Sequence, residues 1–483
     1  MSRAGKSAQR TAAIARHMAS SPKSKIPEEE PSVLFENNLA LRQYSLNRPN
    51  KLNALDAGMI KSLRSQVEEW GQSPLTGTVV GTGNGRAFCA GGDVAGVVEN
   101  ARNKETRAKA VEFFKEEFEL DYILAALPKP YVVVLDGITM GGGVGLAAHA
   151  PFRIATENTV FAMPEAKIGY FPDVGASYFL SKMDGELGTY LSLTSDTLKG
   201  RAVYEHGFAT HFISSRRVAV LLDRLKALES PSLEIIDRTI EELASEPEHD
   251  EAGSILVGDI RVAIDSVFRH SEVELILKDL KELSQRPDGP VAKWAARTLE
   301  TLRLRSPTSL KVALKAIRKG KDMALLDVLQ MELGIATAFC SGASPDFETG
   351  VTSVLLTKTT DRPAWSPNTV EAVTPEILSR FFSSSSTYLK DTPQLSVPEN
   401  LTKLPSDPMR FALPTEAAIA RRFTASKSPI STVPDLLQHF CGGDVLRPAK
   451  MGAKEKVLEV VHRRCQFVDH GDGRKEHWIR WRN

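Results

Sequence analysis

The sequence predicts an α/β protein, and three observations lead to this fold class. From residue 33 to about residue 213, short β-prone segments alternate with segments that suit helices. The run Tyr131 to Leu135 is β-branched, apolar and short, as expected of a strand that is covered on both faces. Between about residues 215 and 340, apolar residues recur every three or four positions, as in residues 218–225 and 273–280. We therefore expect an α/β core followed by a helical region.

Three consecutive glycines, Gly141 to Gly143, follow the predicted strand at 131–135. The small residues at 146–150 suit a helix, so the glycines would lie at a helix N-terminus. Unpaired N–H groups there favour negative charge, and glycine lets a substrate approach the backbone closely. Such a turn can hold an acyl oxygen as it becomes an oxyanion. Tight strand-to-helix packing without a ligand explains the same residues equally well.

A second glycine-rich loop, residues 81–93, follows the β-prone segment 78–80. Further along, the segment 160–163 leads to Glu165, and Asp173 follows in a Phe-Pro-Asp sequence. Two loops of backbone donors and two carboxylates at strand ends are the parts of an active site. Taken singly, Glu165 also suits a helix start and Asp173 suits a turn or N-cap.

Several ordered motifs resemble the enoyl-CoA hydratase/isomerase (crotonase) superfamily: residues 47–55 (NRPNKLNAL), 87–93 (AFCAGGD), 137–143 (GITMGGG) and 163–165 (MPE). Within that superfamily, residues 113–117 (FFKEE), 138–146 (ITMGGGVGL) and 171–175 (FPDVG) are similar to the 3-hydroxyisobutyryl-CoA hydrolase family. The resemblance runs from about residue 33 to about residue 384, and it includes residues 346–351 and 362–365. It implies a crotonase-like ββα spiral core.

The resemblance also implies roles for individual residues. The thioester carbonyl would accept hydrogen bonds from the backbone N–H groups of Ala90 and Gly142, which would form the oxyanion hole. The residues that line the acyl pocket would be Glu117, Gly142, Glu165 and Asp173, and all four are present. Losing one oxyanion donor typically raises a barrier by about 2.7–4 kcal/mol.

One departure from the hydratase pattern favours hydrolysis over hydration. Hydratases carry a glutamate two residues after the third glycine, and this chain has Gly145 there. Glu165 and Asp173 remain, one as nucleophile or base and the other as proton donor or substrate-hydroxyl contact. The sequence does not divide these roles. Two carboxylates in a poorly solvated cleft should raise at least one pKa and supply the protonated partner.

Four further candidate site residues also have a structural interpretation. Glu117 lies in the sequence Lys-Glu-Glu-Phe-Glu, which also reads as a charged helix surface. Lys51 and Arg86 could attract a CoA phosphate or be ordinary surface charges. Cys89, beside the predicted oxyanion loop, suits a small buried thiol better than a nucleophile.

Composition and motifs exclude other classes of protein. The chain has no Gly-x-Ser-x-Gly elbow, Walker loop, His-Glu-x-x-His helix or Cys-x-x-Cys pair, and its 4 cysteines are scattered over 483 residues. No apolar run approaches the roughly 18 residues that span a bilayer. We expect no metal and no cofactor, because carboxylates and backbone dipoles suffice for thioester hydrolysis and CoA arrives with the substrate. A reducing compartment and no membrane contact are expected.

The first residues form a separate region. Residues 1–27 contain six lysines and arginines and no acid, with several serines and alanines. This composition is typical of a mitochondrial presequence, although a disordered basic tail explains it too. We assign residues 1–31 to this region and predict a location in the mitochondrial matrix.

The remaining chain divides into a core at 32–214, a helical part at 215–382, and a linker with a C-terminal extension at 383–483. Prolines at 393–414 suggest extended, poorly folded chain, whereas residues 415–422 and 454–461 read as helices. Residues 391–483 carry 15 Lys/Arg against 11 Asp/Glu, a mild excess of +4, and end in tryptophans and arginines.

This extension supports a second hypothesis. The resemblance includes fungal relatives that are components of the mitochondrial small ribosomal subunit, so the extension would contact ribosomal proteins and rRNA. Alternatively, it caps the enzyme's own surface or that of a sister subunit in a homo-oligomer. Both functions can coexist, and acyl specificity and oligomeric state are not predicted.

Overall fold

The strand expected at 131–135 lies inside a six-stranded sheet of the computed structural model. The structure describes residues 30–247, 251, 253–401, 403–405, 407–425, 430–442, 450–468 and 478–482. Nearly all of the predicted presequence lies outside the described residues. The sheet has the order β1-β2-β3-β5-β7-β10, from β1 (Val33–Asn38), β2 (Leu41–Leu46), β3 (Thr78–Gly83), β5 (Tyr131–Leu135), β7 (Phe152–Ala155) and β10 (His211–Phe212). Only β1 pairs antiparallel, with β2.

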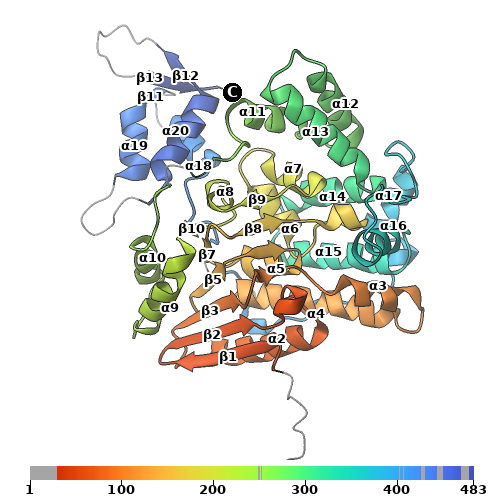
Figure 1. Cartoon of the computed structure of the whole chain (residues 1–483), viewed down its shortest axis with the longest axis horizontal. Helices are drawn as coiled ribbons and strands as arrows, with labels where there is room; N and C mark the ends of the chain where they lie inside the picture. The colour runs from red at the N-terminus through yellow and green to blue at the C-terminus, as the bar shows by residue number, and fades with distance from the viewer. Residues whose placement is uncertain are drawn as a thin grey trace, which may run out of the picture. The chain divides into compact units, whose positions relative to one another are not determined.

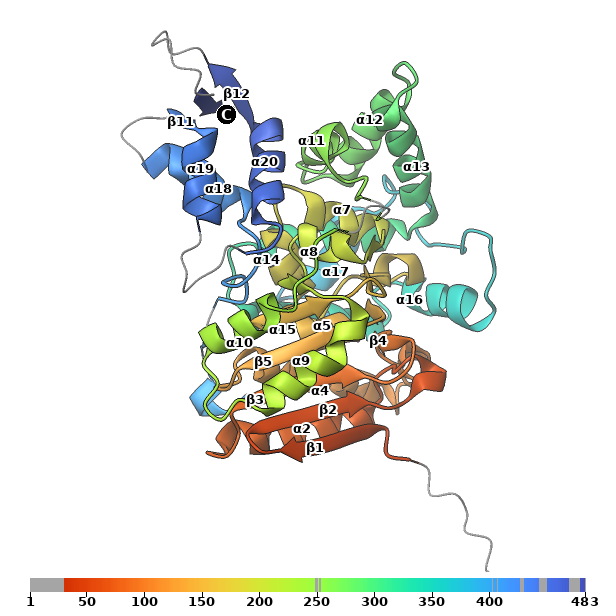
Figure 2. The ribbon, with the colours of Figure 1, turned by 60° about the vertical axis from the view of Figure 1, so that its left-hand side comes forward.

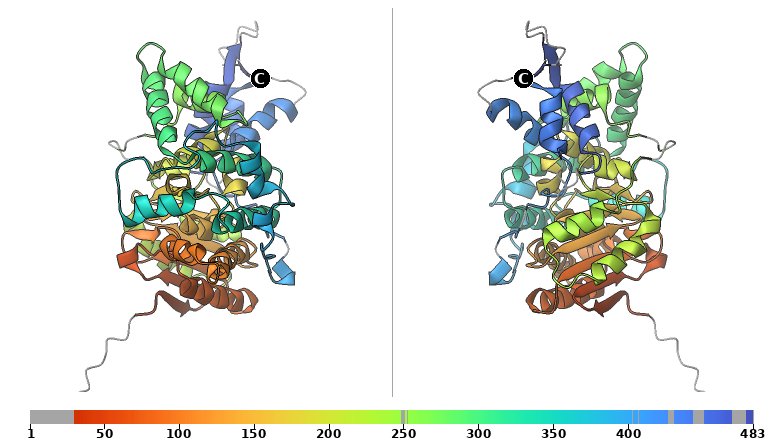
Figure 3. Two further views of the ribbon diagram at one scale, coloured as in Figure 1. Left: turned by 90° about the vertical axis from the view of Figure 1, so that its right-hand side faces the viewer. Right: turned by 90° about the vertical axis from the view of Figure 1, so that its left-hand side faces the viewer.

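Both faces of this sheet are covered by helices, as the apolar run at 131–135 predicts. Helices α9 (Val218–Lys226) and α10 (Leu233–Glu241) cover one face (Figures 2 and 3), where they pack on Val132 and Val134. Helices α2 (Ala57–Gln72) and α4 (Arg107–Ala125) cover the other face, and Tyr131, Val133 and Leu135 belong to that larger core (Figure 1). Alternate residues of one strand thus supply two hydrophobic layers.

A smaller sheet carries the glycine-rich loops. Its order is β4 (Ala87–Cys89), β6 (Ile138–Met140), β8 (Val160–Ala162) and β9 (Leu198–Lys199), and the first three strands are parallel. Because parallel strands end at the same edge, the segments that follow β4, β6 and β8 emerge together. The core also contains α3 (Val94–Arg102), α5 (Gly142–Ala148), α6 (Ala176–Phe179), α7 (Leu187–Thr194) and α8 (Arg201–Glu205).

The helical region predicted after residue 215 is confirmed. It includes α9 and α10 and continues with α11 (Gly258–Val267), α12 (Val273–Ser284), α13 (Pro290–Leu304), α14 (Pro307–Gly320), α15 (Leu325–Cys340), α16 (Asp346–Gly350) and α17 (Pro375–Phe382). The apolar repeats at 218–225 and 273–280 fall in α9 and α12. No helix among the described residues is both long and apolar enough to cross a membrane.

We name the segment 391–415 the strap. Its described residues are mostly extended, as predicted, but they are not poorly folded, so that part of the prediction is wrong. The Leu395 N–H donates to Gln330 Oε1 at 2.9 Å, and the Ser396 N–H donates to Glu119 Oε1 at 2.6 Å. Phe411 stacks on Phe152 with ring centroids 4.8 Å apart. The prolines leave only a short 3₁₀ helix, Glu399–Leu401, among the described strap residues, and side chains of the core accept hydrogen bonds from strap N–H groups.

The rest of the extension forms a small layer with its own core (Figure 1). Its sheet has the order β11-β13-β12, and the elements are α18 (Glu416–Ala425), β11 (Ile430–Thr432), α19 (Val433–Cys441), α20 (Ala453–Arg464), β12 (Cys465–Val468) and β13 (Trp478–Trp481). The helices expected at 415–422 and 454–461 are α18 and α20. The prediction for the terminal residues left their structure open, and Trp478 to Trp481 form the central strand.

Ion pairs connect this layer to the core. Lys456 Nζ lies 2.8 Å from Asp184 Oδ2, and Arg464 Nη2 lies 2.7 Å from Asp265 Oδ2. Arg463, whose side chain is 1% exposed, lies between Asp265, Glu416 and Glu459. The extension therefore packs on the chain's own surface, which is one of the two arrangements that the sequence left open.

Candidate active site

Two backbone N–H groups face a common space where β4 and β6 end. A Cβ built on Gly142, the first residue of α5, would lie 3.4 Å from the nitrogen of Gly92. Leu55 pairs with Gly92 in a parallel bridge through the carbonyl of Gly91 and the N–H of Asp93, so the Gly92 N–H points away from Leu55. In the described part of the chain, neither the Gly92 nor the Gly142 N–H donates to a protein acceptor. The Gly92 and Gly142 N–H groups are therefore arranged as the two donors of an oxyanion hole would be.

The predicted donor Ala90 needs a correction. Its N–H donates to the carbonyl of Leu52 at 3.0 Å, so this group holds the two loops together and is not available to a ligand. Gly92 takes the place that the sequence argument gave to Ala90, because the chain turns through Gly91 at a φ of 115°. The prediction placed the donor two residues too early in the Ala-Gly-Gly sequence, because each of these residues carries a backbone N–H group.

Glu117 extends from α4 toward these two donors. Its Oε1 lies 2.2 Å from the position that a Gly142 Cβ would occupy and 3.7 Å from the equivalent position on Gly92. The side chain is buried, and Oε1 has no hydrogen-bond partner among the described residues. A buried carboxyl oxygen without a partner is costly, which argues against the charged helix surface as its role.

Glu165 and Asp173 approach the same space from the segment after β8. Glu165 begins a short 3₁₀ helix, and its Oε1 lies 2.9 Å from a Cβ position on Gly141. Asp173 is buried two residues before Gly175, and Val174 between them has a φ of 53°, which is strained for a β-branched residue. The structure thus brings Glu117, Glu165 and Asp173 around the glycine turn.

A further buried acid, Glu332 of α15, holds the Asp173 loop. Its two carboxylate oxygens accept hydrogen bonds from the Gly175 N–H at 2.6 Å and the Ser177 N–H at 2.9 Å. These bonds satisfy N–H groups at the start of α6 that would otherwise be orphaned. Glu332 thereby offsets the strain at Val174 and keeps the loop in place.

Burial raises the pKa of every acid around the turn, as the sequence argument expected of at least one. It raises the pKa of Asp173 to about 7, and the nearby Tyr170 hydroxyl offsets part of the rise. Burial, together with repulsion from Asp173, raises the pKa values of Glu117 and Glu165 well above the usual range. At neutral pH the cluster therefore holds protons as well as charge, which allows one carboxyl to act as acid and another as base.

Asp121 is a fourth buried acid, and the sequence argument missed it. It lies one helical turn after Glu117 on α4, is fully buried, and neither carboxyl oxygen has a hydrogen-bond partner in the described chain. A Cβ on Gly145 would lie 2.5 Å from Asp121 Oδ2. Burial, then Glu117 and Asp173, raise its pKa. The spacing of four residues was the available signal, because it places both acids on one helix face.

The remaining candidates fall into two groups. Lys51 and Arg86 are both exposed and lie on neighbouring loops, where the Asn53 side chain donates to the carbonyls of Asn84 and Ala87. Cys89 is buried, its thiol donates to the Gly91 carbonyl, and burial raises its pKa to about 12. A neutral buried thiol is not a nucleophile, in agreement with the simpler prediction.

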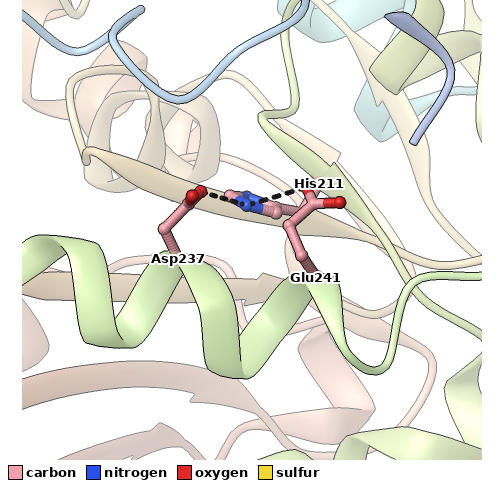
Figure 4. Close-up of side chains that lie close together, drawn as sticks. All are labelled: His211, Asp237 and Glu241. Atoms are coloured by element: carbon pink, nitrogen blue, oxygen red, sulfur yellow. Dashed lines mark hydrogen bonds and ion pairs between the residues drawn. The ribbon is translucent and has the colours of Figure 1, made fainter. Parts of the chain in front are cut away.

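One side-chain cluster has the residue types of a metal site. His211 Nε2 lies 3.0 Å from Asp237 Oδ1 and 3.3 Å from Glu241 Oε1 (Figure 4). Lys450 of the extension, however, places its ammonium 2.5 Å from the same Glu241 oxygen. A divalent cation would have to displace that charge, so the cluster acts here as an ion-pair link between α10, β10 and the extension.

Comparison with known proteins identifies the family of the chain. Residues 41–382 match the family model for enoyl-CoA hydratase/isomerase, and the chain belongs to this family. Among solved structures, a carnitinyl-CoA dehydratase from Mycobacterium thermoresistibile is 30% identical with a TM-score of 0.67, and the match covers 76% of this chain and 99% of that chain. The crotonase fold predicted from the sequence is therefore confirmed.

Two kinds of relative are equally similar in sequence. The human mitochondrial 3-hydroxyisobutyryl-CoA hydrolase is 40% identical over 377 residues, which are 78% of this chain and 94% of that protein. The small ribosomal subunit protein mS47 of Neurospora crassa is 40% identical over 473 residues, which cover 93% of this chain and 89% of that protein. A match of that length must continue well into the C-terminal extension.

Proposed function

We propose that the protein hydrolyses 3-hydroxyisobutyryl-CoA, or a close 3-hydroxyacyl-CoA, to the free acid and CoA. One observation carries the proposal: the buried acids Glu117, Glu165 and Asp173 surround two free N–H groups, while position 145 lacks the hydratase glutamate. Sequence similarity to mitochondrial 3-hydroxyisobutyryl-CoA hydrolases supports the same substrate class.

The Gly92 and Gly142 N–H groups would hold the thioester oxygen as negative charge develops on it. Glu165, in its ionised form, would attack the carbonyl carbon or remove a proton from the water that does so. The carbon–sulfur bond then breaks, and the CoA thiolate takes a proton from Asp173, whose pKa of about 7 lets it hold that proton near neutral pH. If Glu165 attacks directly, water then cleaves the mixed anhydride and regenerates the Glu165 carboxylate, and by either route water supplies the oxygen of the product acid. No metal or redox cofactor is required by this route.

The binding of the two ends of the substrate follows from the same layout. Glu117 is close enough to Gly142 to contact the acyl group or its hydroxyl. Lys51 and Arg86, exposed on neighbouring loops, would attract the phosphates of CoA. The acyl group would thus be buried and the nucleotide would lie near the surface.

Release of free CoA from (S)-3-hydroxyisobutyryl-CoA, followed with a thiol reagent, tests this proposal. Wild-type protein should turn over, and Glu165→Gln should lose at least about a thousandfold in kcat with an unchanged circular dichroism spectrum. Lys61→Gln, an exposed change on α2, is the matched control and should retain full activity. An inactive wild-type protein would refute the proposal.

We propose a second function, association with the mitochondrial small ribosomal subunit, because the similarity to mS47 includes the C-terminal extension. The extension carries exposed groups suited to a partner, among them Phe467, which is 64% exposed, and Arg480. The hydrolase relatives are mitochondrial by name, and the basic first 27 residues agree with import into the matrix. The hydrolase site and the extension use different residues, so the two functions are compatible.

Gradient sedimentation of mitochondrial extract tests the second function. Full-length protein should migrate with the small subunit, whereas a protein that lacks residues 416–483 should stay at the top. This cut leaves the strap, whose residues pack on the core, in place. The double variant Phe467→Ser with Arg480→Glu should also dissociate from the small subunit, and the control variant Lys61→Glu should remain bound to it. Full-length protein at the top of the gradient would contradict the proposal.

A further inference from the structure

A cavity outside the acyl site lies where the strap crosses the C-terminal end of α5. Its volume is about 510 Å³, within the roughly 300–1,000 Å³ of small-molecule sites. The core contributes His149, Arg153, Phe208 and the side chains around Lys182, and the strap contributes Asp407 and Met409. We name it the strap cavity. None of the acids or glycines of the acyl site lines it.

The charges that line the strap cavity do not balance. Arg153 is 1% exposed, and its guanidinium donates to the carbonyls of Phe208, Ala150 and Pro408, all of them neutral acceptors. Lys182 holds its ammonium 3.2 Å from the ring centre of Tyr178. Neither cation forms an ion pair within the described part of the chain, and Asp407 is the one acid in the lining. The lining therefore carries a net charge of +1 at neutral pH.

A buried guanidinium without a carboxylate at ion-pair distance is unusual, because its desolvated charge is stabilised here only by carbonyl dipoles and by the more distant Asp407. Burial lowers the pKa of Arg153 to about 9, which leaves it charged at neutral pH. One Nη2 donor faces only the weak acceptor Sδ of Met409, at 3.3 Å. The site thus offers both charge and a poorly used donor to an anion.

The rest of the lining is mostly apolar, and its uncharged polar side chains are His149, Tyr178 and Thr415. Phe179, Met183, Phe208 and Met409 supply flat and flexible hydrophobic surface. His149 is 4% exposed, and neither ring nitrogen makes a hydrogen bond of acceptable geometry to a described residue, although the Val174 backbone is near. The imidazole Nε2 faces Gly175, where a built Cβ would lie 2.6 Å away, so His149 forms part of the cavity wall and supplies no charge to it.

We propose that the strap cavity binds a small organic monoanion, a carboxylate with an apolar body, whose charged group lies between Arg153 and Lys182. The net lining charge of +1 matches one carboxylate, and the apolar body packs on Phe208 and Met409. Because the strap forms one wall, the ligand holds the start of the C-terminal extension against the core. The proposal does not rest on the proposed hydrolase activity.

Calorimetric titration of the full-length protein with octanoate tests this inference, with octanamide as the neutral analogue of equal length. Octanoate should bind one per chain and at least tenfold more tightly than octanamide. Lys182→Gln should weaken octanoate binding several-fold and leave octanamide unchanged, while Lys199→Gln, an exposed lysine outside the lining, should change neither. Met409→Trp should fill the cavity and abolish binding of both.

Three results would overturn the proposal: no octanoate binding at millimolar concentration, equal binding of octanoate and octanamide, or octanoate binding that free CoA or a CoA thioester displaces. The last would place the ligand at the acyl site. All variants should retain the wild-type circular dichroism spectrum and melting temperature without ligand. If Met409→Trp misfolds, the comparison of Lys182→Gln with Lys199→Gln still decides the question, because both changes are at exposed side chains.

Discussion

Gly145 and Asp121 occupy one space, so a side chain at position 145 should cost less stability when the Asp121 carboxyl is removed. In Gly145→Ala the new methyl carbon would lie 2.5 Å from Asp121 Oδ2 and 2.7 Å from Val174 Cβ, against a preferred separation of roughly 3.5–4.0 Å. Such overpacking costs about 1–3 kcal/mol, and the stiffer unfolded chain returns about 0.4–1 kcal/mol. The difference spans about 0–2.6 kcal/mol, so we expect a loss of about 1 kcal/mol in the free energy of unfolding.

Urea unfolding followed by tryptophan fluorescence measures this change as a shift of the midpoint at constant slope. In the double variant Gly145→Ala with Asp121→Ala, the methyl takes the space that the carboxyl vacates, so the two changes should couple by at least about 1 kcal/mol. Gly96→Ala is the matched control, because its Cβ meets nothing within 4 Å, and it should be neutral or stabilising. If Gly145→Ala behaves like Gly96→Ala, or if the two changes simply add, the steric reasoning is wrong.

Three other outcomes follow from the geometry of the site. Gly142→Ala puts a methyl between the two N–H donors and should lower kcat/KM for CoA release by about 10²–10³ without unfolding the protein, and near-normal activity would contradict the donor assignment. Glu332→Gln loses one of the two carboxylate acceptors for the Gly175 and Ser177 N–H groups, so kcat and the melting temperature should fall together. The free energy of unfolding should decrease by about 1–3 kcal/mol. If kcat and the melting temperature are both unchanged, Glu332 does not hold the Asp173 loop. The folded pKa of Asp173 is raised from 3.8 to about 7, so the folded state binds more protons and stability should decline as pH rises from about 4 to about 7. In Asp173→Asn, the free energy of unfolding measured by urea titration should decline less steeply with pH. An equally steep decline in the variant would refute the pKa shift of Asp173 as its cause.

The backbone of the site was predictable because its signals are local. The β-branched run before the glycines, the β-prone segment before the second loop, and the apolar repeats at 218–225 and 273–280 each depend on residues close in sequence. Glu117, Glu165 and Asp173 could be named from the motif resemblance, and the structure brings them around Gly142. The resemblance rather than periodicity supplied Glu117, since its neighbours read as a solvated helix face.

The parts that were missed depend on long-range contacts. Ala90 and Gly92 differ only in which way the backbone turns, and the bridge between Leu55 and Gly92 decides it from 37 residues away. Asp121 becomes conspicuous only when Gly145 is seen against its carboxyl. The strap reads as loose chain because its partners, such as Gln330 and Glu119, are distant in sequence. Sequence patterns indicate the local secondary-structure propensity, whereas these three features depend on tertiary packing between residues that are distant in sequence.

Polarisation of the thioester carbonyl by the Gly92 and Gly142 N–H groups is the claim from which the catalytic proposal follows. Isotope-edited infrared spectroscopy of (S)-3-hydroxyisobutyryl-CoA labelled with carbon-13 at the carbonyl, bound to the Glu165→Gln variant, measures it without turnover. The account predicts a carbonyl stretch at lower frequency than in water, and loss of that shift when Gly142→Ala is added. A bound carbonyl with its solution frequency, or one whose shift survives Gly142→Ala, would contradict the account.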